Sequence, residues 1–139
     1  MEKTKRTITL TGTRPVTIVS DEWPVIAHGS YSDHDGENVG RNPVECQANR
    51  TWKTDIRVRQ HADGRAIVYG VWVYDSQFSN ESNLGGKAGV LFNAGGDVIA
   101  AIREVAATME AQTERDGADG QHVEQVADEC IADLPAEEI

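Results

Sequence analysis

The sequence predicts an α+β domain in which an antiparallel sheet of four or five strands carries two C-terminal helices packed on one face. Three observations support this prediction. Residues 53–59 alternate between apolar and charged side chains, residues 65–74 form an apolar run after a glycine turn, and residues 98–134 place apolar side chains at helical spacing. The chain has 139 residues, the size range of one domain, and we expect residues 1–139 to form a single domain.

The N-terminal third begins with two short alternating runs, residues 7–11 and 15–19, which predict a β-hairpin. Residues 20–24 then have the features of a helix start: a capping side chain, acidic residues in the first turn and a proline. We therefore expect a short helix that ends at Gly29. The polar segment 30–42 has no periodicity, which indicates a loop.

The second strand of the central pair is apolar on both faces. Residues 53–59 have one apolar and one charged face, but residues 65–74 are apolar at every position after the first. An antiparallel strand normally exposes one face to water, so the second face, which includes Trp72 and Tyr74, needs either a helix or a partner above it.

The C-terminal half reads as a loop, a short strand and two helices. Residues 77–89 are polar and contain adjacent glycines, so a loop is expected there, followed by a strand at 90–92. Asp97 is expected to cap a helix that ends at Gly117. A second helix is expected over residues 119–134, closed by a proline.

The formal net charge of −10 is concentrated in the second half of the chain. Residues 1–70 carry a net charge of +1 and residues 71–139 carry −11. Because phosphate contacts need a basic surface, we expect no direct partnership with nucleic acid and none with a membrane. The absence of a long apolar run or a hydrophobic signal core predicts a cytoplasmic protein. Cys46 and Cys130 lie far apart and are expected to be reduced thiols.

Motifs for catalysis, metals and cofactors are weak, so we expect a protein that is not an enzyme and holds neither metal nor cofactor. Residues 33–37 gather metal-type ligands but lack the spacing of a calcium loop. The glycine-rich segment 85–89 lacks the spacing of a phosphate loop and is expected to be a flexible turn. An enzyme built from His34, Asp35 and His61 is the alternative.

A group of basic residues surrounds the first central strand: Arg50, Lys53, Arg57, Arg59 and Arg65. With Trp52 nearby, such a group on one sheet face is one way to hold nucleic acid. Asp55 interrupts the group and the protein as a whole repels polyanions. We therefore expect these side chains to be solvated or paired with the protein's own acids.

The strongest candidate for a binding surface is a set of helical carboxylates: Glu110, Glu114, Glu124, Asp128, Glu129 and Asp133. They form three like-charge i,i+4 pairs, each of which costs a few tenths of a kcal/mol. Asp133 also lies near a helix C-terminus, where the macrodipole disfavours anions. Solubility alone explains such a surface; the sharper interpretation is an array that imitates a phosphate backbone or docks on an Arg/Lys-rich partner.

Residues 59–70 and 130–139 resemble segments of uncharacterised small acidic accessory proteins carried by phages and mobile elements of proteobacteria. That class includes inhibitors of host defence, anti-CRISPR proteins among them, which occupy nucleic-acid-binding surfaces of their targets. The resemblance therefore implies a non-enzymatic, nucleic-acid-mimicking inhibitor that binds a basic surface of a host protein or complex. The alternative is a structural module that forms a homodimer through the sheet face around Trp72 and Tyr74.

Overall fold

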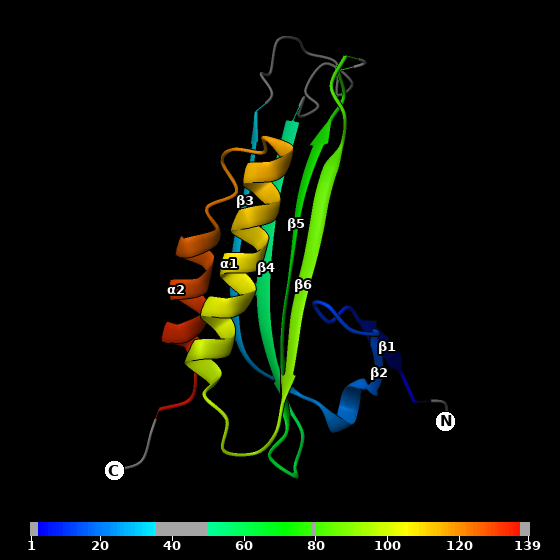
Figure 1. Ribbon diagram of the computed structural model, residues 1–139, viewed down its shortest axis with the longest axis vertical. Helices are drawn as coiled ribbons and strands as arrows, with labels where there is room; N and C mark the ends of the chain where they lie inside the picture. Colours follow the sequence, from blue (N-terminus) through cyan, green and yellow to red (C-terminus); the bar gives the residue numbers. More distant parts are fainter. Residues whose placement is uncertain (1–2, 36–49, 79, 137–139) are drawn as a thin grey trace, which may run out of the picture.

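The computed structural model describes residues 3–35, 50–78 and 80–136. It contains a β-hairpin, a four-stranded antiparallel meander of order β3-β4-β5-β6 and two helices (Figure 1). The elements are β1 (Lys5–Ile8), β2 (Val16–Val19), β3 (Val25–Asp35), β4 (Arg50–Gln60), β5 (Ala66–Ser76), β6 (Leu84–Phe92), α1 (Val98–Asp116) and α2 (Val123–Asp133). The predicted α+β class, with two C-terminal helices against the sheet, is confirmed.

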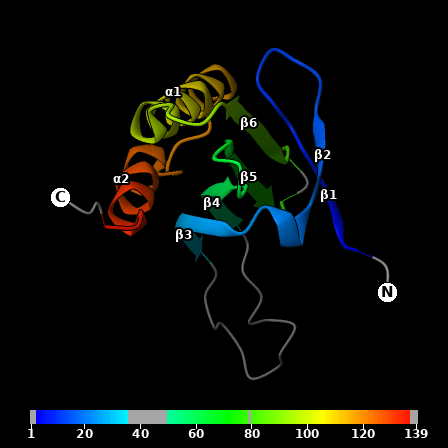
Figure 2. The same ribbon diagram turned by 90° about the horizontal axis from the view of Figure 1, so that it is seen from below.

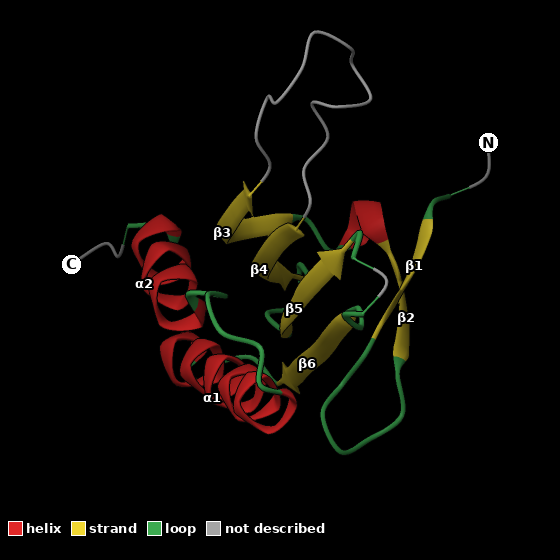
Figure 3. Ribbon diagram, turned by 90° about the horizontal axis from the view of Figure 1, so that it is seen from above, coloured by secondary structure: helices red, strands yellow, loops and turns green. Residues whose placement is uncertain are grey.

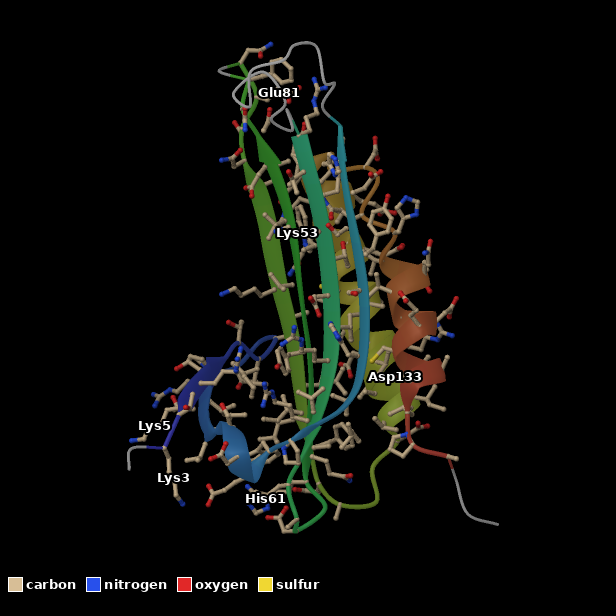
Figure 4. All side chains as sticks on the ribbon, turned by 180° about the vertical axis from the view of Figure 1, so that it is seen from behind. Lys3, Lys5, Lys53, His61, Glu81 and Asp133 are labelled. Atoms are coloured by element: carbon tan, nitrogen blue, oxygen red, sulfur yellow. The ribbon has the colours of Figure 1, made fainter. Side chains whose placement is uncertain are left out.

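The meander lies between two covers. Figures 2 and 3 show α1 and α2 on one face and the β1–β2 hairpin on the opposite face. A large buried cluster fills the space between the helices and the sheet, and a smaller one lies under the hairpin. The hairpin covers only one end of its face, and no other described element lies over the remainder, which is called the open face below (Figure 4).

The two covers answer the question of the second apolar face of β5. Val68 and Trp72 belong to the cluster under the helices, whereas Ile67 packs under the hairpin with Tyr69. The Trp72 side chain is fully buried, and its indole Nε1–H donates to Oε1 of Gln112 on α1 at 2.9 Å. Trp72 is therefore part of the monomer core and is not exposed for the self-association that the sequence left open.

The helix predicted before Gly29 is wrong. Residues Ser20–Glu22 form a single 3₁₀ turn, and the chain enters β3 at Val25. Gly29 does not end a helix; it faces α2, where an added Cβ would lie 2.8 Å from the backbone nitrogen of Cys130. A glycine within a strand is typical of such a close approach. The loop predicted over residues 30–42 is also wrong for its first part, because β3 continues to residue 35; residues 36–42 lie outside the described residues.

The loop predicted over residues 77–89 is likewise too long, and the flexible turn predicted at 85–89 is wrong. The loop ends before Leu84, and residues 84–89 belong to β6. Gly86 pairs with Trp72, and an added Cβ there would collide with the Trp72 indole and with the amide group of Gln112. The glycines of this segment make room for neighbouring groups and do not form a turn.

The helix ends follow the predicted signals at α1 and differ at α2. Asp97 accepts the Ala100 N–H at 3.0 Å, and Gly117 ends α1 with a left-handed φ of 69°. The second helix begins at Val123, later than predicted, because Gln121 is used to anchor the connection: its amide accepts from the Thr54 hydroxyl at 2.9 Å and donates to the Val73 carbonyl at 3.2 Å.

Candidate protein-binding surface

The acidic helical layer, defined here as residues 98–133, carries nine carboxylates and two arginines, a net charge of −7. The carboxylates are Glu104, Glu110, Glu114, Asp116, Asp119, Glu124, Asp128, Glu129 and Asp133. The apolar stripe of each helix is buried against the sheet. Because a helix that buries one stripe exposes the others, the charged positions face solvent.

Five of the six predicted binding residues are exposed, and Glu110 is half-buried. Glu114 and Glu129 have no basic side chain within 4.0 Å among the described residues. These two carboxylates therefore offer uncompensated charge, one on each helix.

Arg103 of α1 joins the two helices electrostatically. Its Nη1 lies 2.8 Å from Oδ1 of Asp128 and 3.4 Å from Oε2 of Glu124. All three side chains are exposed, so the pairs stabilise the fold by at most about 1 kcal/mol. The like-charge pair predicted from i,i+4 spacing thus shares an arginine, a contact between helices that helical spacing alone does not indicate.

The pKa of Glu110 reflects burial and the excess of negative charge in the layer. Burial raises the pKa of its carboxyl group, and the charges of Glu124 and Glu114 raise that pKa further. A carboxyl group in this position is harder to ionise than one in water. A cation that approached it would stabilise the ionised form.

Asp133 has a structural role in addition to its place on the surface. Its Oδ2 accepts the backbone N–H of His28 in β3 at 2.9 Å, which ties the end of α2 to the sheet (Figure 4). Replacement of Asp133 would therefore disturb packing as well as surface charge.

The basic residues of β4 mostly contact the protein's own groups. Arg57 Nε lies 3.3 Å from Asp55 Oδ1, which also bonds the imidazole of His28. Arg59 is only 6% exposed and donates to the Tyr69 hydroxyl at 2.8 Å.

The two flanking arginines behave in the same way. Arg50 Nη2 lies 3.0 Å from Glu81 Oε2, and Arg65 Nε lies 2.8 Å from Asp63 Oδ2. Lys53 is the exception in this group, exposed on the open face of the sheet (Figure 4). The expectation of pairing with internal acids is confirmed for Arg50, Arg57 and Arg65, and Arg59 is buried against uncharged groups.

The residues of the enzyme alternative are not brought together. His34 lies opposite Thr51 near the start of β4, whereas His61 follows the end of that strand, about 30 Å away at the rise of an extended chain. Within the described ranges, no group of three or more His, Cys, Asp or Glu side chains is placed to hold a metal ion. The side chain of Asp35 lies outside the described residues, as do Gly36 and Glu37.

The thiol of Cys130 is fully buried, and burial raises its pKa to about 11. It is therefore a protonated, unreactive core side chain, as expected from the sequence. Cys46 lies outside the part of the chain that the structure describes.

Comparison with known proteins adds no family. Protein-family models, curated proteins and solved structures give no match to this chain. Neither of the described helices combines the length and the apolar character needed to cross a membrane. The functional argument therefore depends on the chain's own residues.

Proposed function

We propose that the protein is a non-enzymatic interaction module that binds a basic surface of a partner through its acidic helical layer. The observation that carries the proposal is the net charge of −7 on the acidic helical layer, where Glu114 and Glu129 have no cationic partner among the described side chains. Opposite charges on two surfaces speed association and select the partner.

The charges stand on helices that are packed against the sheet. The 19 residues of α1 give a helix about 28 Å long, and its apolar stripe packs on β5 and β6. Carboxylates on such a support keep their spacing, as the phosphates of a nucleic-acid backbone do. This favours a nucleic-acid-binding complex of the host cytoplasm as the target, which the protein would inhibit by occupying its basic surface.

The test reverses the charge of acids that form no ion pair within the described part of the protein. Glu114→Lys with Glu129→Lys changes two exposed acids, whereas reversal at Glu124 or Asp128 would also place a lysine against Arg103. The matched control makes the same change in charge outside the helical layer, at the exposed acids Asp21 and Asp75.

The measurement is a titration of the partner captured from a host lysate with the parent, reversed and control proteins at two salt concentrations. We expect the parent and the control to bind alike, the reversed protein to bind more weakly by tenfold or more, and binding to weaken as salt rises. Equal and salt-independent affinities for all three proteins would refute the proposal, as would failure to capture any partner. Acidity that serves solubility alone predicts that only aggregation changes.

A further inference from the structure

A cavity of about 660 Å³ opens at the end of the sheet that is remote from the hairpin. Its lining includes Trp52, Tyr74 and Leu84 from the sheet, together with Asp116 and Asp119 from the end of α1 and the connection that follows. Figure 1 shows the C-terminal end of α1 at the same end of the molecule as the β5–β6 turn, and Figure 4 places Glu81 at this end. The acidic helical layer therefore extends to the rim of an open surface cavity.

One wall of the cavity is aromatic. Trp52 and Tyr74 are register partners in β4 and β5, and their ring centroids lie 5.6 Å apart in an edge-to-face arrangement. Trp52 is half-buried and reaches toward Gly120, where an added Cβ would lie 3.4 Å from its indole nitrogen. Aromatic faces attract cations, and tryptophan does so most strongly.

A second part of the lining is negative. Asp116 and Asp119 supply two carboxylates, and the C-terminal end of the 19-residue helix α1 adds the negative pole of its macrodipole. Asp116 pairs with Arg115 outside the cavity at 3.0 Å. Asp119 is exposed and has no cationic side chain within 4.0 Å in the described part of the chain.

The protein already binds one guanidinium group at this end. Arg50 makes two hydrogen bonds to the Glu81 carboxylate, at 3.0 and 3.1 Å, and lies 4.5 Å from the centre of the Phe78 ring. Glu81 also accepts from the hydroxyls of Tyr74 and Ser76, and these bonds, with that of Arg50 as the largest, lower its pKa to about 2. Because Glu81 pairs with Arg50 and Asp116 pairs with Arg115, Asp119 carries the one uncompensated charge among the described lining residues.

We infer that this cavity binds the guanidinium group of an arginine side chain of the partner, between the Trp52 and Tyr74 rings and the carboxylates of Asp116 and Asp119. Arginine suits the site better than lysine, because its planar group stacks on aromatic rings while donating to carboxylates. Binding of the group itself is independent of the proposed function, which is needed only for the source of the arginine.

The direct test is an NMR titration of the ¹⁵N-labelled protein with N-acetyl-arginine methylamide. The neutral citrulline analogue, which has nearly the same shape, is the control ligand. We expect saturable shifts of the Trp52 indole N–H and of the backbone amides of Gly117 and Asp119 with the arginine compound, and none with the citrulline compound. Equal shifts with both compounds, or shifts spread along both helices, would overturn the inference.

Variants separate the site from general acidity. Asp119→Asn changes an exposed side chain and should keep the fold, and it should weaken binding of the arginine compound about threefold; adding Asp116→Asn should weaken it tenfold or more. The matched control, Glu114→Gln with Glu129→Gln, removes the same charge elsewhere on the layer and should alter affinity less than twofold. If both pairs weaken binding equally, the cavity has no special role.

The two proposals fail in different ways. If the arginine compound binds at Trp52 but reversal of Glu114 and Glu129 leaves the captured partner unaffected, the proposed function is wrong and the cavity remains a guanidinium site. If that reversal abolishes partner binding but the compound does not shift the Trp52 signal, the inference about the cavity is wrong and the proposed function stands.

Discussion

Truncation of Trp72 to alanine tests the arrangement of the whole sheet. The Trp72 side chain is 0% exposed, and removal of a buried tryptophan typically costs about 3–5 kcal/mol. The lost hydrogen bond to Gln112 adds about 1 kcal/mol. We therefore expect Trp72→Ala to remove about 4–6 kcal/mol, a large part of the stability of a domain of this size.

The assay is urea denaturation followed by circular dichroism at two widely separated protein concentrations. Because Trp72 packs within its own chain, the loss should be the same at both concentrations. Trp52→Ala is the matched control: its ring is half-exposed, so about 2 kcal/mol should be lost. A Trp72→Ala midpoint equal to that of the parent would show that the ring is outside the core, and a loss that depends on concentration would return Trp72 to a dimer interface.

Two further predictions concern close packing and pH. Gly29→Ala should lower the free energy of unfolding by about 3 kcal/mol, because the new methyl group would collide with the backbone of α2. Gly85→Ala, at an exposed strand position, should be nearly neutral. Comparison of the urea midpoints of the two variants with that of the parent checks both expectations. Glu81, whose pKa falls from 4.5 to about 2 in the folded protein, stabilises the fold fully above its unfolded pKa and loses this contribution as pH falls to about 2. Glu81→Gln should therefore flatten the dependence of the midpoint on pH in that window, and a parallel curve would contradict the role of the Arg50 pair.

The elements that the sequence predicted well have strong local signals. The paired strands β4 and β5 follow an alternating and an apolar run around a glycine turn, and α1 has a capping aspartate, a helical apolar stripe and a terminal glycine. These signals are local because each depends on residues that are close together in the sequence.

The missed strands have their cause far away in the chain. On its side facing the helices β3 carries Ala27 and Gly29, and β6 carries Gly86 and Ala88, where α2 and α1 approach the sheet closely. Small residues have weak strand propensity, so their sequence pattern indicates a loop. At these positions, however, the close packing of the helices on the sheet requires small residues. The contact that explains Gly29 involves Cys130, and no local pattern connects positions so far apart.

The candidate surface was predictable in outline and not in its internal contacts. Helical spacing places the carboxylates of α1 and α2 on the exposed side, which the structure bears out. The Arg103 bridge, the bond from His28 to Asp133 and the cavity beside Trp52 all depend on how the helices pack on each other and on the sheet.

The positions of the acids bear on the choice between solubility and the binding proposed above. Solubility needs net charge but no particular position for it. Here nine carboxylates occupy the helical layer, where burial and the charges of Glu124 and Glu114 raise the pKa of Glu110. The open face of the sheet carries charges of both signs, among them the exposed side chains of Lys53 and Asp75. In the binding proposed above, a cationic surface that covers the layer would relieve the electrostatic repulsion at Glu110.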